Sequence, residues 1–408
     1  MQKRILVVSQ HYWPENFRIT DICKGFADDG IAVDVLCGIP NYPQGEWFSG
    51  YSYTKPRRET HENCIIFRAG EIRRKGNTSL SIFLNYISFP VCACFNLWRL
   101  HGRHYDAVFC YETSPVLMML PAIVYAKLHR VPLTTYVLDL WPENLYSVLP
   151  IQNKFLRRIA SAVSHWHYRR SEQLIAMSPA LAEKIKSIAP NAKIAMIPQY
   201  CEDFYAQKCQ KVSPLTPLKG AFTVLFAGNF SPAQDLNLLI ACAKRLKEAA
   251  RNDIHFVLVG DGMSRAALVA DIQKNDLSSY FTLKDSCPAS QIPAYHAAAD
   301  ALFAALAKSE DLGLTVPAKI AGYLAAEKPL LVAISGEASR IINEAHCGFA
   351  SESGDADALF ANLVALADLP AAARAQMGAN GFAYYEAHYR RSTLLSELEH
   401  FILNESSI

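Results

Sequence analysis

Short apolar segments of strand length alternate with helical segments along most of this chain, and this alternation constrains the fold more than any other feature. Because the short segments are apolar at successive positions, they are typical of parallel strands that are buried on both faces. In the first half, strands are predicted at residues 5–9, 32–36, 65–68, 107–111, 133–138, 173–177 and 193–197, separated by helices such as 18–29, 116–128 and 155–171. The pattern predicts a doubly wound parallel sheet.

The alternation stops at residues 201–220, where Lys, Gln, Ser and two Pro are concentrated, and then starts again. Further strands are predicted at 223–227, 254–259, 280–283, 301–304 and 330–333, with helices at 236–249, 265–274, 292–298 and 319–326. We therefore expect an α/β protein with two tandem Rossmann-like domains, residues 1–205 and 206–380, that face a cleft. Residues 381–408 are expected to contain a C-terminal helix able to cross back to the first domain.

The charge of the chain is unevenly distributed. The 408 residues carry a net charge of +2, which does not suggest a nucleic-acid-binding protein. Residues 1–200 hold 23 basic and 15 acidic side chains, whereas the rest of the chain has an acidic excess. The first half is therefore expected to meet an anionic partner. Eleven scattered Cys, and an N-terminus that runs directly into a strand without an export signal, predict a cytoplasmic protein.

Two segments of the first half suggest contact with a membrane. Residues 79–98 carry no charge and are long enough to cross a bilayer, but Asn85, Pro90 and Asn96 make the segment a poor spanning helix, so a buried or interfacial position is preferred. The second segment mixes cations with aromatic rings at Arg157, Arg158, Trp166, Tyr168, Arg169 and Arg170. This mixture suits an anionic membrane surface, although a solvated basic face explains the charges equally well.

Glycine-rich turns follow two strands of the second half. Ligands of open parallel sheets bind beyond the carboxyl ends of the strands, where Gly228-Asn229 and Gly260-Asp261-Gly262 lie. Glycines there allow backbone amides to approach a phosphate, although ordinary tight turns use glycine as well. Lys319 is predicted in the first turn of a helix, where a cation is unfavourable unless an anion is bound beside it. We favour a phosphate-binding role for Lys319 over that of a solvated lysine.

With these residues in view, the chain resembles the retaining glycosyltransferases of GT-B architecture, family four, over nearly its whole length. Within that family it is similar to the bacterial polysaccharide-assembly branch that includes N-acetyl-L-fucosamine transferases. The first half contributes three motifs, His11-Tyr12-Trp13-Pro14-Glu15, Gly38-Ile39-Pro40-Asn41-Tyr42-Pro43-x-Gly45 and Asp139-Leu140-Trp141-Pro142-Glu143. The second half contributes Gly228-Asn229, Gly260-Asp261-Gly262 and Pro317-Ala318-Lys319.

The resemblance implies a nucleotide-sugar donor, by preference UDP-linked, held by the second domain, and an acceptor held by the first. It implies transfer of a hexose-type or N-acetylated deoxyhexose sugar with retention, onto a polyprenyl-diphosphate-linked saccharide in surface polysaccharide (O-antigen or capsule type) assembly. No metal or other cofactor is expected, since basic side chains and helix termini neutralise the diphosphate leaving group. The implied donor-binding residues are Gly228, Asn229, Gly260, Asp261, Gly262, Arg265, Glu310 and Lys319.

The sequence departs from the family pattern around the donor. Many members carry two glutamates separated by seven residues, and Glu310 resembles the first of them. The second glutamate is absent, because the two possible alignments place Ala318 or Gly322 at its position. The Arg and Lys that other members carry after the first glycine turn are replaced by Asn229 and Gln234. The ribose contact is therefore expected to come from another residue.

Carboxylates follow the predicted strands of the first half. Asp139 comes directly after strand 133–138, where it can accept the proton of an attacking hydroxyl, although Asp is also a common helix N-cap. Glu112 follows strand 107–111 and is a second catalytic candidate. Glu15, Asn16 and Glu143 are expected to contact the acceptor.

A zinc site is the least favoured interpretation of the Cys and His residues of the chain. Cys92 and Cys94 point in different directions if residues 79–98 are helical, so they are expected to be buried thiols. Two functional alternatives remain open. One is a nucleotide-sugar 2-epimerase of the same architecture, and the other is a non-catalytic two-lobed ligand-binding protein, which normally carries an export signal.

Overall fold

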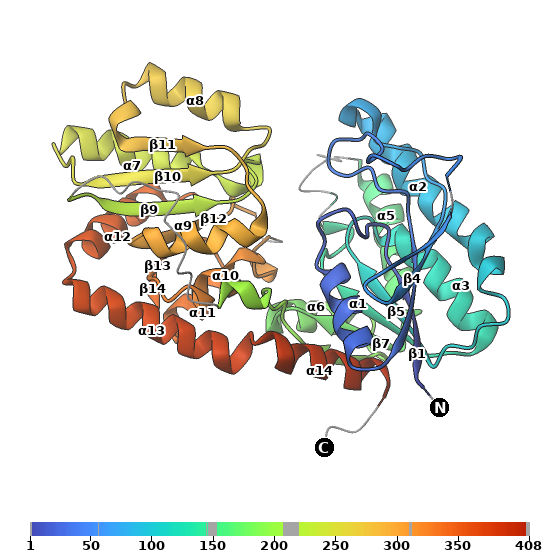
Figure 1. Ribbon diagram of the computed structural model, residues 1–408. Coiled ribbons are helices and arrows are strands. Elements are labelled where there is room, and N and C mark those ends of the chain that lie inside the picture. Colours follow the sequence, from blue (N-terminus) through green and yellow to red (C-terminus); the bar gives the residue numbers. More distant parts are fainter. Residues whose placement is uncertain are drawn as a thin grey trace. The chain divides into compact units, whose positions relative to one another are not determined.

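The computed structural model describes residues 2–55, 57–143, 145, 153–206, 220–309 and 312–404 (Figure 1). Contacts between residues divide the chain into two compact units, which consist of Met1–Ile197 with Leu395–Ile408 and of Pro198–Leu394. The division after Ile197 lies earlier than the boundary expected at 205–206 from composition. Part of the Lys-, Gln- and Pro-rich stretch, residues 207–219, lies outside the described residues.

The first unit contains an eight-stranded sheet in the order β3-β4-β2-β1-β5-β6-β7-β8. Its strands are β1 (Arg4–Val8), β2 (Ala32–Cys37), β3 (Arg58–His61), β4 (Cys64–Arg68), β5 (Ala107–Glu112), β6 (Leu133–Val137), β7 (Gln173–Ala176) and β8 (Lys193–Met196). The strand pairs are parallel except that β3 runs antiparallel to β4. The seven strands predicted from apolar runs are all present. The polar edge strand β3, whose residues are at most half-buried, gave no such signal.

Helices cover the sheet of the first unit. They are α1 (Ile19–Asp28), α2 (Ser79–Asn96), α3 (Leu120–His129), α5 (Lys154–Tyr168) and α6 (Pro179–Ile188), with the 3₁₀ turn η3 (Val116–Met119) before α3. Side chains cap three of these helices at their N-termini, because Thr78, Asn153 and Ser178 accept hydrogen bonds from amides in the first turns of α2, α5 and α6.

The second unit contains a six-stranded parallel sheet in the order β11-β10-β9-β12-β13-β14. Its strands are β9 (Phe222–Ala227), β10 (Ile254–Val259), β11 (Phe281–Lys284), β12 (Ala301–Ala305), β13 (Leu330–Ala333) and β14 (Gly348–Ser351). Alternate side chains of β9 enter separate apolar clusters on its two faces, with Val224 and Phe226 in one and Leu225 and Ala227 in the other. Burial on both faces explains the continuous apolar runs in the sequence.

The helices of the second unit are α7 (Asn237–Glu248), α8 (Arg265–Lys274), α9 (Ile292–Ala298), α10 (Lys319–Ala325), α11 (Glu337–Glu344), α12 (Ala356–Asp368) and α13 (Ala371–His388). The last helix, α14 (Arg391–Ile402), starts in this unit and ends in the first. Within the first unit, Asn404 accepts a hydrogen bond from Gln173 over 2.7 Å, and the ammonium group of Lys193 lies 5.1 Å from the ring centre of Phe401.

The two units are therefore doubly wound α/β sheets, as expected from the alternation of apolar runs and helices. In each unit the strand order reverses beside the first strand, at β1 and at β9. Ligands of such sheets bind at the carboxyl ends of the strands next to this reversal. Functional residues are therefore expected after β1, β2, β5 and β6 in the first unit, and after β9, β10 and β12 in the second.

Candidate functional site

The glycine turns of the second unit pack directly against one another. Gly260 has a φ of +148°, and a Cβ atom there would lie only 1.9 Å from the carbonyl oxygen of Gly228. No side chain fits such a contact, which explains why glycine is required. The glycine amides serve the same packing, because Gly228 donates to Val259 (3.0 Å) and Gly260 donates to Lys284 (3.1 Å). Gly262 donates to the Asp261 carboxylate over 2.8 Å. These three amides are therefore engaged in the turns themselves.

Lys319, the first residue of α10, brings a positive charge to the first of these turns. Its ammonium group donates a hydrogen bond to the side-chain oxygen of Gln234 and lies 4.0 Å from the ring centre of Phe226. A Cβ atom on Gly228 would lie 3.2 Å from the same nitrogen, so the ammonium group sits against the first glycine turn. Burial lowers the pKa of Lys319 to about 7. A bound diphosphate would stabilise the charged form of this lysine.

The interaction of Lys319 with Gln234 explains one departure from the family pattern. Gln234 stands where other members place a basic residue after the glycine turn, and its side chain here holds the ammonium group of Lys319. A cation from a residue 85 positions later therefore lies beside this turn. Sequence reasoning identified Lys319 but not its partner, because no local pattern connects residues so far apart.

The remaining predicted donor residues of the second unit take different positions. Arg265 pairs with Asp285 over 2.7 Å and donates to the carbonyl of Gly260 over 3.0 Å, so it braces the second glycine turn. Asn229 and Asp261 are exposed beside the turns. Glu310 lies outside the described residues.

One of the two positions that align with the missing second glutamate, Gly322, packs against an aromatic ring. Gly322 is buried in α10, and a Cβ atom there would lie 3.3 Å from the ring of Tyr205. A side chain at position 322 would therefore have to shift this ring. The alternative position, Ala318, is exposed immediately before α10. Of the two positions, 322 therefore packs against an aromatic ring, whereas 318 is exposed.

In the first unit, Glu112 is the last residue of β5, and Asp139 follows the neighbouring strand β6. Asp139 is half-buried, whereas Glu112 is fully buried and neither of its carboxyl oxygens has a hydrogen-bond partner among the described residues. Burial raises the pKa of Glu112 well above its ordinary value, and the nearby charge of Asp139 raises it further. Glu112 is thus enclosed, and its carboxyl group is not exposed on the surface of the unit.

Tyr42 also lies within electrostatic range of Asp139. Burial raises the pKa of the Tyr42 hydroxyl, Arg74 opposes this shift, and the negative charge of Asp139 contributes to it. The guanidinium carbon of Arg74 lies 5.2 Å from the ring centre of Tyr42. The loop after β2 and the end of β6 therefore converge on one polar region. The sequence analysis did not predict Tyr42 as a site residue. Its place in the motif that runs from Gly38 to Gly45 was the one indication of a functional role.

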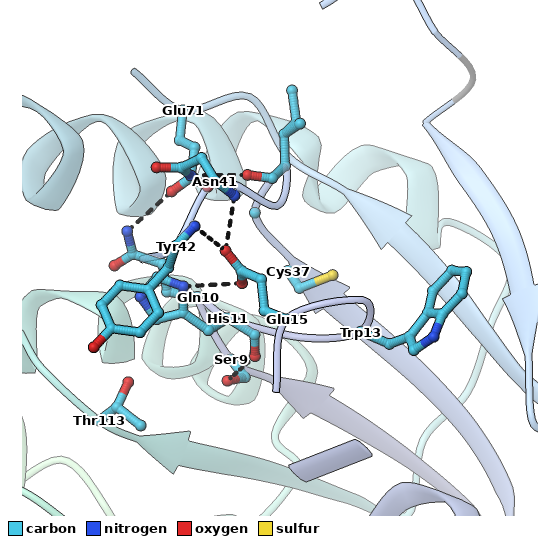
Figure 2. Close-up of polar contacts among 12 residues, drawn as sticks. Ser9, Gln10, His11, Trp13, Glu15, Cys37, Asn41, Tyr42, Glu71 and Thr113 are labelled. Atoms are coloured by element: carbon cyan, nitrogen blue, oxygen red, sulfur yellow. Dashed lines mark hydrogen bonds and ion pairs between the residues drawn. The ribbon is translucent and has the colours of Figure 1, made fainter. Parts of the chain in front are cut away.

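Glu15 is a buried support of this loop and not an exposed acceptor contact (Figure 2). One of its carboxylate oxygens accepts the amides of Asn41 (2.8 Å) and Tyr42 (2.7 Å), and the other lies 3.0 Å from the ring of His11. Burial alone would raise the pKa of Glu15, but His11 and the two amides outweigh it and lower the pKa. The carboxylate thus fixes the backbone of the loop. The neighbouring residue Asn16 is exposed.

A second buried carboxyl group, Glu71, lies beside Asn41 of the same loop (Figure 2) and also bonds to Asn85 of helix α2. Its oxygens accept hydrogen bonds from Asn41 (2.8 Å), Gln10 (2.9 Å) and Asn85 (3.2 Å). Burial raises the pKa of Glu71 well above its ordinary value. Sequence reasoning missed this network, because its members come from four separate segments with no shared motif.

Glu143 ends the motif that begins at Asp139. It forms an ion pair with Lys184 over 3.2 Å, and its other carboxyl oxygen is buried. The indole nitrogen of Trp141, in the same motif, donates to the hydroxyl of Ser114 over 2.9 Å. Glu143 and Trp141 therefore anchor the segment that follows Asp139.

Replacing Glu15 by alanine is expected to lower the free energy of unfolding by about 3 kcal/mol, because two buried backbone amides lose their acceptor. Chemical denaturation at neutral pH measures this loss. Since the folded-state pKa is lowered, the stabilisation is present above the ordinary pKa and is lost as the pH falls below it. The difference between wild type and Glu15→Ala should therefore shrink in acid. An unchanged unfolding midpoint at neutral pH would contradict the supporting role.

Comparisons with known proteins agree with this arrangement. The family model "Glycosyl transferase 4-like domain" matches residues 16–199, and "Glycosyl transferases group 1" matches residues 212–383. A 2-deoxystreptamine glucosyltransferase from Streptomyces kanamyceticus is 25% identical over 322 residues, which are 75% of this chain and 78% of that protein.

Solved structures share the fold. Anabaena Alr3699/HepE in complex with UDP and glucose superposes with a TM-score of 0.68 at 15% identity, covering 98% of this chain and 99% of that one. WaaG, a glycosyltransferase involved in lipopolysaccharide biosynthesis, gives a TM-score of 0.66 at 14% identity, covering 98% of this chain and 99% of that one. With two doubly wound units and a glycosyltransferase model matched in each, the chain is a GT-B glycosyltransferase of the group 1 type, an enzyme that transfers a sugar from a nucleotide donor.

Proposed function

We propose that the chain transfers a hexose or an N-acetylated deoxyhexose, with retention of anomeric configuration, from a UDP-linked donor to a polyprenyl-diphosphate-linked saccharide. The product belongs to a surface polysaccharide of the O-antigen or capsule type in a bacterium. The observation that carries the donor half of the proposal is the Lys319 ammonium group, held by Gln234 against the Gly228 turn. That turn follows β9, where the strand order of the second sheet reverses.

In this proposal Lys319 stabilises the diphosphate as it leaves. Negative charge accumulates on the diphosphate when the bond to the sugar breaks, and a fixed cation beside it lowers the barrier without reorganisation. The similar Anabaena protein was solved in complex with UDP and glucose, which favours uridine as the base. Because a side chain provides this charge, we propose that the reaction needs no divalent metal, and transfer should persist in EDTA.

The acceptor half of the proposal rests on Asp139. Its half-buried carboxylate follows β6 and lies within electrostatic range of Tyr42. We assign to Asp139 the role of accepting or orienting the proton of the attacking hydroxyl. Tyr42, fixed through the bonds of its amide to Glu15, is placed to orient the acceptor sugar. Glu112 acts at most through Asp139, since it is enclosed.

The lipid-linked nature of the acceptor is supported by the surface of the first unit. Large apolar side chains of α2 and α5 are exposed, and basic residues lie along α5 and directly after α2, at Arg99. Such a surface suits a protein that works at a membrane. We therefore propose that the enzyme is peripheral on the cytoplasmic face of the cell membrane.

A panel of UDP-, GDP- and TDP-sugars, scored by thermal shift, tests the donor assignment. UDP-sugars are expected to raise the melting temperature, and a response confined to GDP- or TDP-sugars would refute uridine. Product analysis with donor alone then separates a transferase from the 2-epimerase alternative. An epimerase converts the sugar of the donor without acceptor, whereas the proposed enzyme leaves it unchanged until a lipid-linked saccharide is added.

A further inference from the structure

The outward face of helix α2 is a continuous apolar stripe. Leu80, Phe83, Ile87 and Val91 recur at helical spacing and are all exposed, as is Phe95 by 76%. Exposed Trp98 continues the stripe in the 3₁₀ turn η2 (Leu97–Leu100) that follows α2. The opposite face carries Asn85, Phe89 and Ala93, which are fully buried against the unit. The stretch Leu80–Leu100 is long and apolar enough to cross a bilayer by length and composition alone. Because one face packs on the protein, lipid cannot surround the helix.

Helix α5 repeats this arrangement. Phe155, Leu156, Ile159, Val163 and Trp166 fall on one face and are exposed, with Phe155 exposed by 70%. The structure corrects one member of the interfacial set expected from the sequence, because Tyr168 is fully buried on the inner face. An exposed apolar face on a single helix is common, but two such faces in one unit call for a partner.

The two stripes belong to one side of the first unit. The connections β4 to β5, β5 to β6 and β6 to β7 all run in the same direction along the sheet, so right-handed crossovers place α2, α3 and α5 on the same face. Helices α2 and α5 also both pack against η3. We call the exposed apolar residues of α2 and α5, together with Trp98 of η2, the lipid surface.

The charges around the lipid surface identify its partner. No Asp or Glu occurs between Glu71 and Asp106, or between Glu143 and Glu172, although both segments carry several Lys and Arg. The guanidinium carbon of Arg99 lies 5.5 Å from the ring centre of Trp98, and that of Arg170 lies 5.1 Å from that of Trp166. Cations beside aromatic rings at the edge of an apolar face match the headgroup region of an anionic bilayer. If a second copy of the chain covered this surface, the basic residues of the two copies would face and repel one another, so a bilayer is the preferred partner.

We infer that α2 and α5 lie together in the interface of an anionic phospholipid bilayer, with the lipid surface among the acyl chains and neither helix spanning the membrane. The inference rests on the proposed lipid-linked acceptor and specifies where that acceptor is met. Asn85, on the inner face of α2, is linked by hydrogen bonds through Glu71 to Asn41, in the loop after β2 that also contains Tyr42. Since a helix is about 10 Å across, the loop lies roughly one helix diameter above the apolar layer. This depth suits a saccharide joined to lipid by a diphosphate at headgroup level.

Vesicle flotation with the full chain tests the surface. Wild type is expected to bind vesicles of phosphatidylcholine with phosphatidylglycerol, and to bind pure phosphatidylcholine more weakly, with an affinity for the former that falls as salt rises. Replacing Phe95 and Trp98 together by serine is expected to reduce binding by about tenfold or more, without changing the charge. Met196→Ser, which removes an exposed apolar side chain from β8, is the matched control and should bind as wild type.

Further measurements separate an interfacial helix from a spanning one, and a bilayer from a second copy of the chain as the partner of the lipid surface. Trp98 and Trp166 are expected to be quenched by brominated acyl chains, and the bound protein should be released by alkaline carbonate, because an interfacial helix does not span. Resistance to carbonate would show a spanning helix and overturn the inference. A concentration-dependent dimer, lost in the Phe95→Ser, Trp98→Ser variant without lipid, would assign the surface to a second copy.

Nucleotide binding separates this inference from the proposed function. Thermal shift with UDP is measured in solution on the same preparations. If UDP binds while vesicles do not, the lipid surface is refuted and the donor assignment survives. If vesicles bind while no nucleotide does, the donor assignment is refuted and the lipid surface survives.

Discussion

Replacing Asp139 by asparagine is expected to lower the transfer rate by two to four orders of magnitude, about the contribution of a positioned general base, while donor affinity stays unchanged. The substitution keeps the size of the side chain and removes its negative charge. Asp139 follows β6 in the first unit, whereas the donor residues belong to the second, so nucleotide binding should not depend on it. Steady-state kinetics give the transfer rate, and calorimetry with UDP gives the affinity.

The control for this substitution is Asp29→Asn, which removes an exposed carboxylate at the end of α1. It should leave transfer unchanged. Full activity in Asp139→Asn would dismiss this residue as a base or orienting group. A fall in nucleotide affinity equal to the fall in rate would instead assign Asp139 to donor binding.

Replacing Lys319 by alanine is expected to weaken the binding of a UDP-sugar by about 10- to 100-fold, the usual value of a hydrogen bond to a charged group. The effect should depend on pH in a defined direction. Because burial lowers the pKa of Lys319 to about 7, the ammonium form dominates below this pH and is lost above it. Wild-type affinity should therefore fall between about pH 6 and about pH 8.5, and binding at the upper end should take up a proton.

In the Lys319→Ala variant both the pH dependence and the proton uptake should disappear. Calorimetry in buffers of different ionisation enthalpy measures the uptake. Lys244→Ala removes an exposed lysine of α7 in the same unit and is the matched control. An affinity that is independent of pH in wild type, or unchanged in Lys319→Ala, would remove Lys319 from the diphosphate site.

For several residues the sequence predicted the position along a helix or strand but not the environment of the side chain. The sequence placed Lys319 at the start of a helix, and the structure confirms that α10 begins there. The sequence also placed Glu15 and Glu112 at strand ends, where substrates bind in such sheets. Their burial was not predictable, because whether a side chain at a strand end faces solvent depends on the loops that fold over it. For Glu15 this is the loop at Asn41 and Tyr42.

For the glycine turns, too, the sequence predicted the position but not the contacts. Their positions after β9 and β10 follow from the sequence, and so does the need for glycine in a tight turn. The partners of their amides do not, since Gly228 and Gly260 donate to carbonyl groups of other strands, Val259 and Lys284. These two amides are therefore engaged within the turns, and the Lys319 side chain is a charged group beside the first of them.

By itself the sequence determined that this protein is two doubly wound sheets and that its chemistry lies after particular strands, because apolar periodicity and glycine requirements are local properties of the chain. The tertiary structure decided which of the polar residues are available to a substrate, and which surface is left apolar. The pairing of Lys319 with Gln234 and the link from Asn85 through Glu71 to Asn41 join residues far apart in the chain. Such contacts arise from packing, which no local pattern encodes.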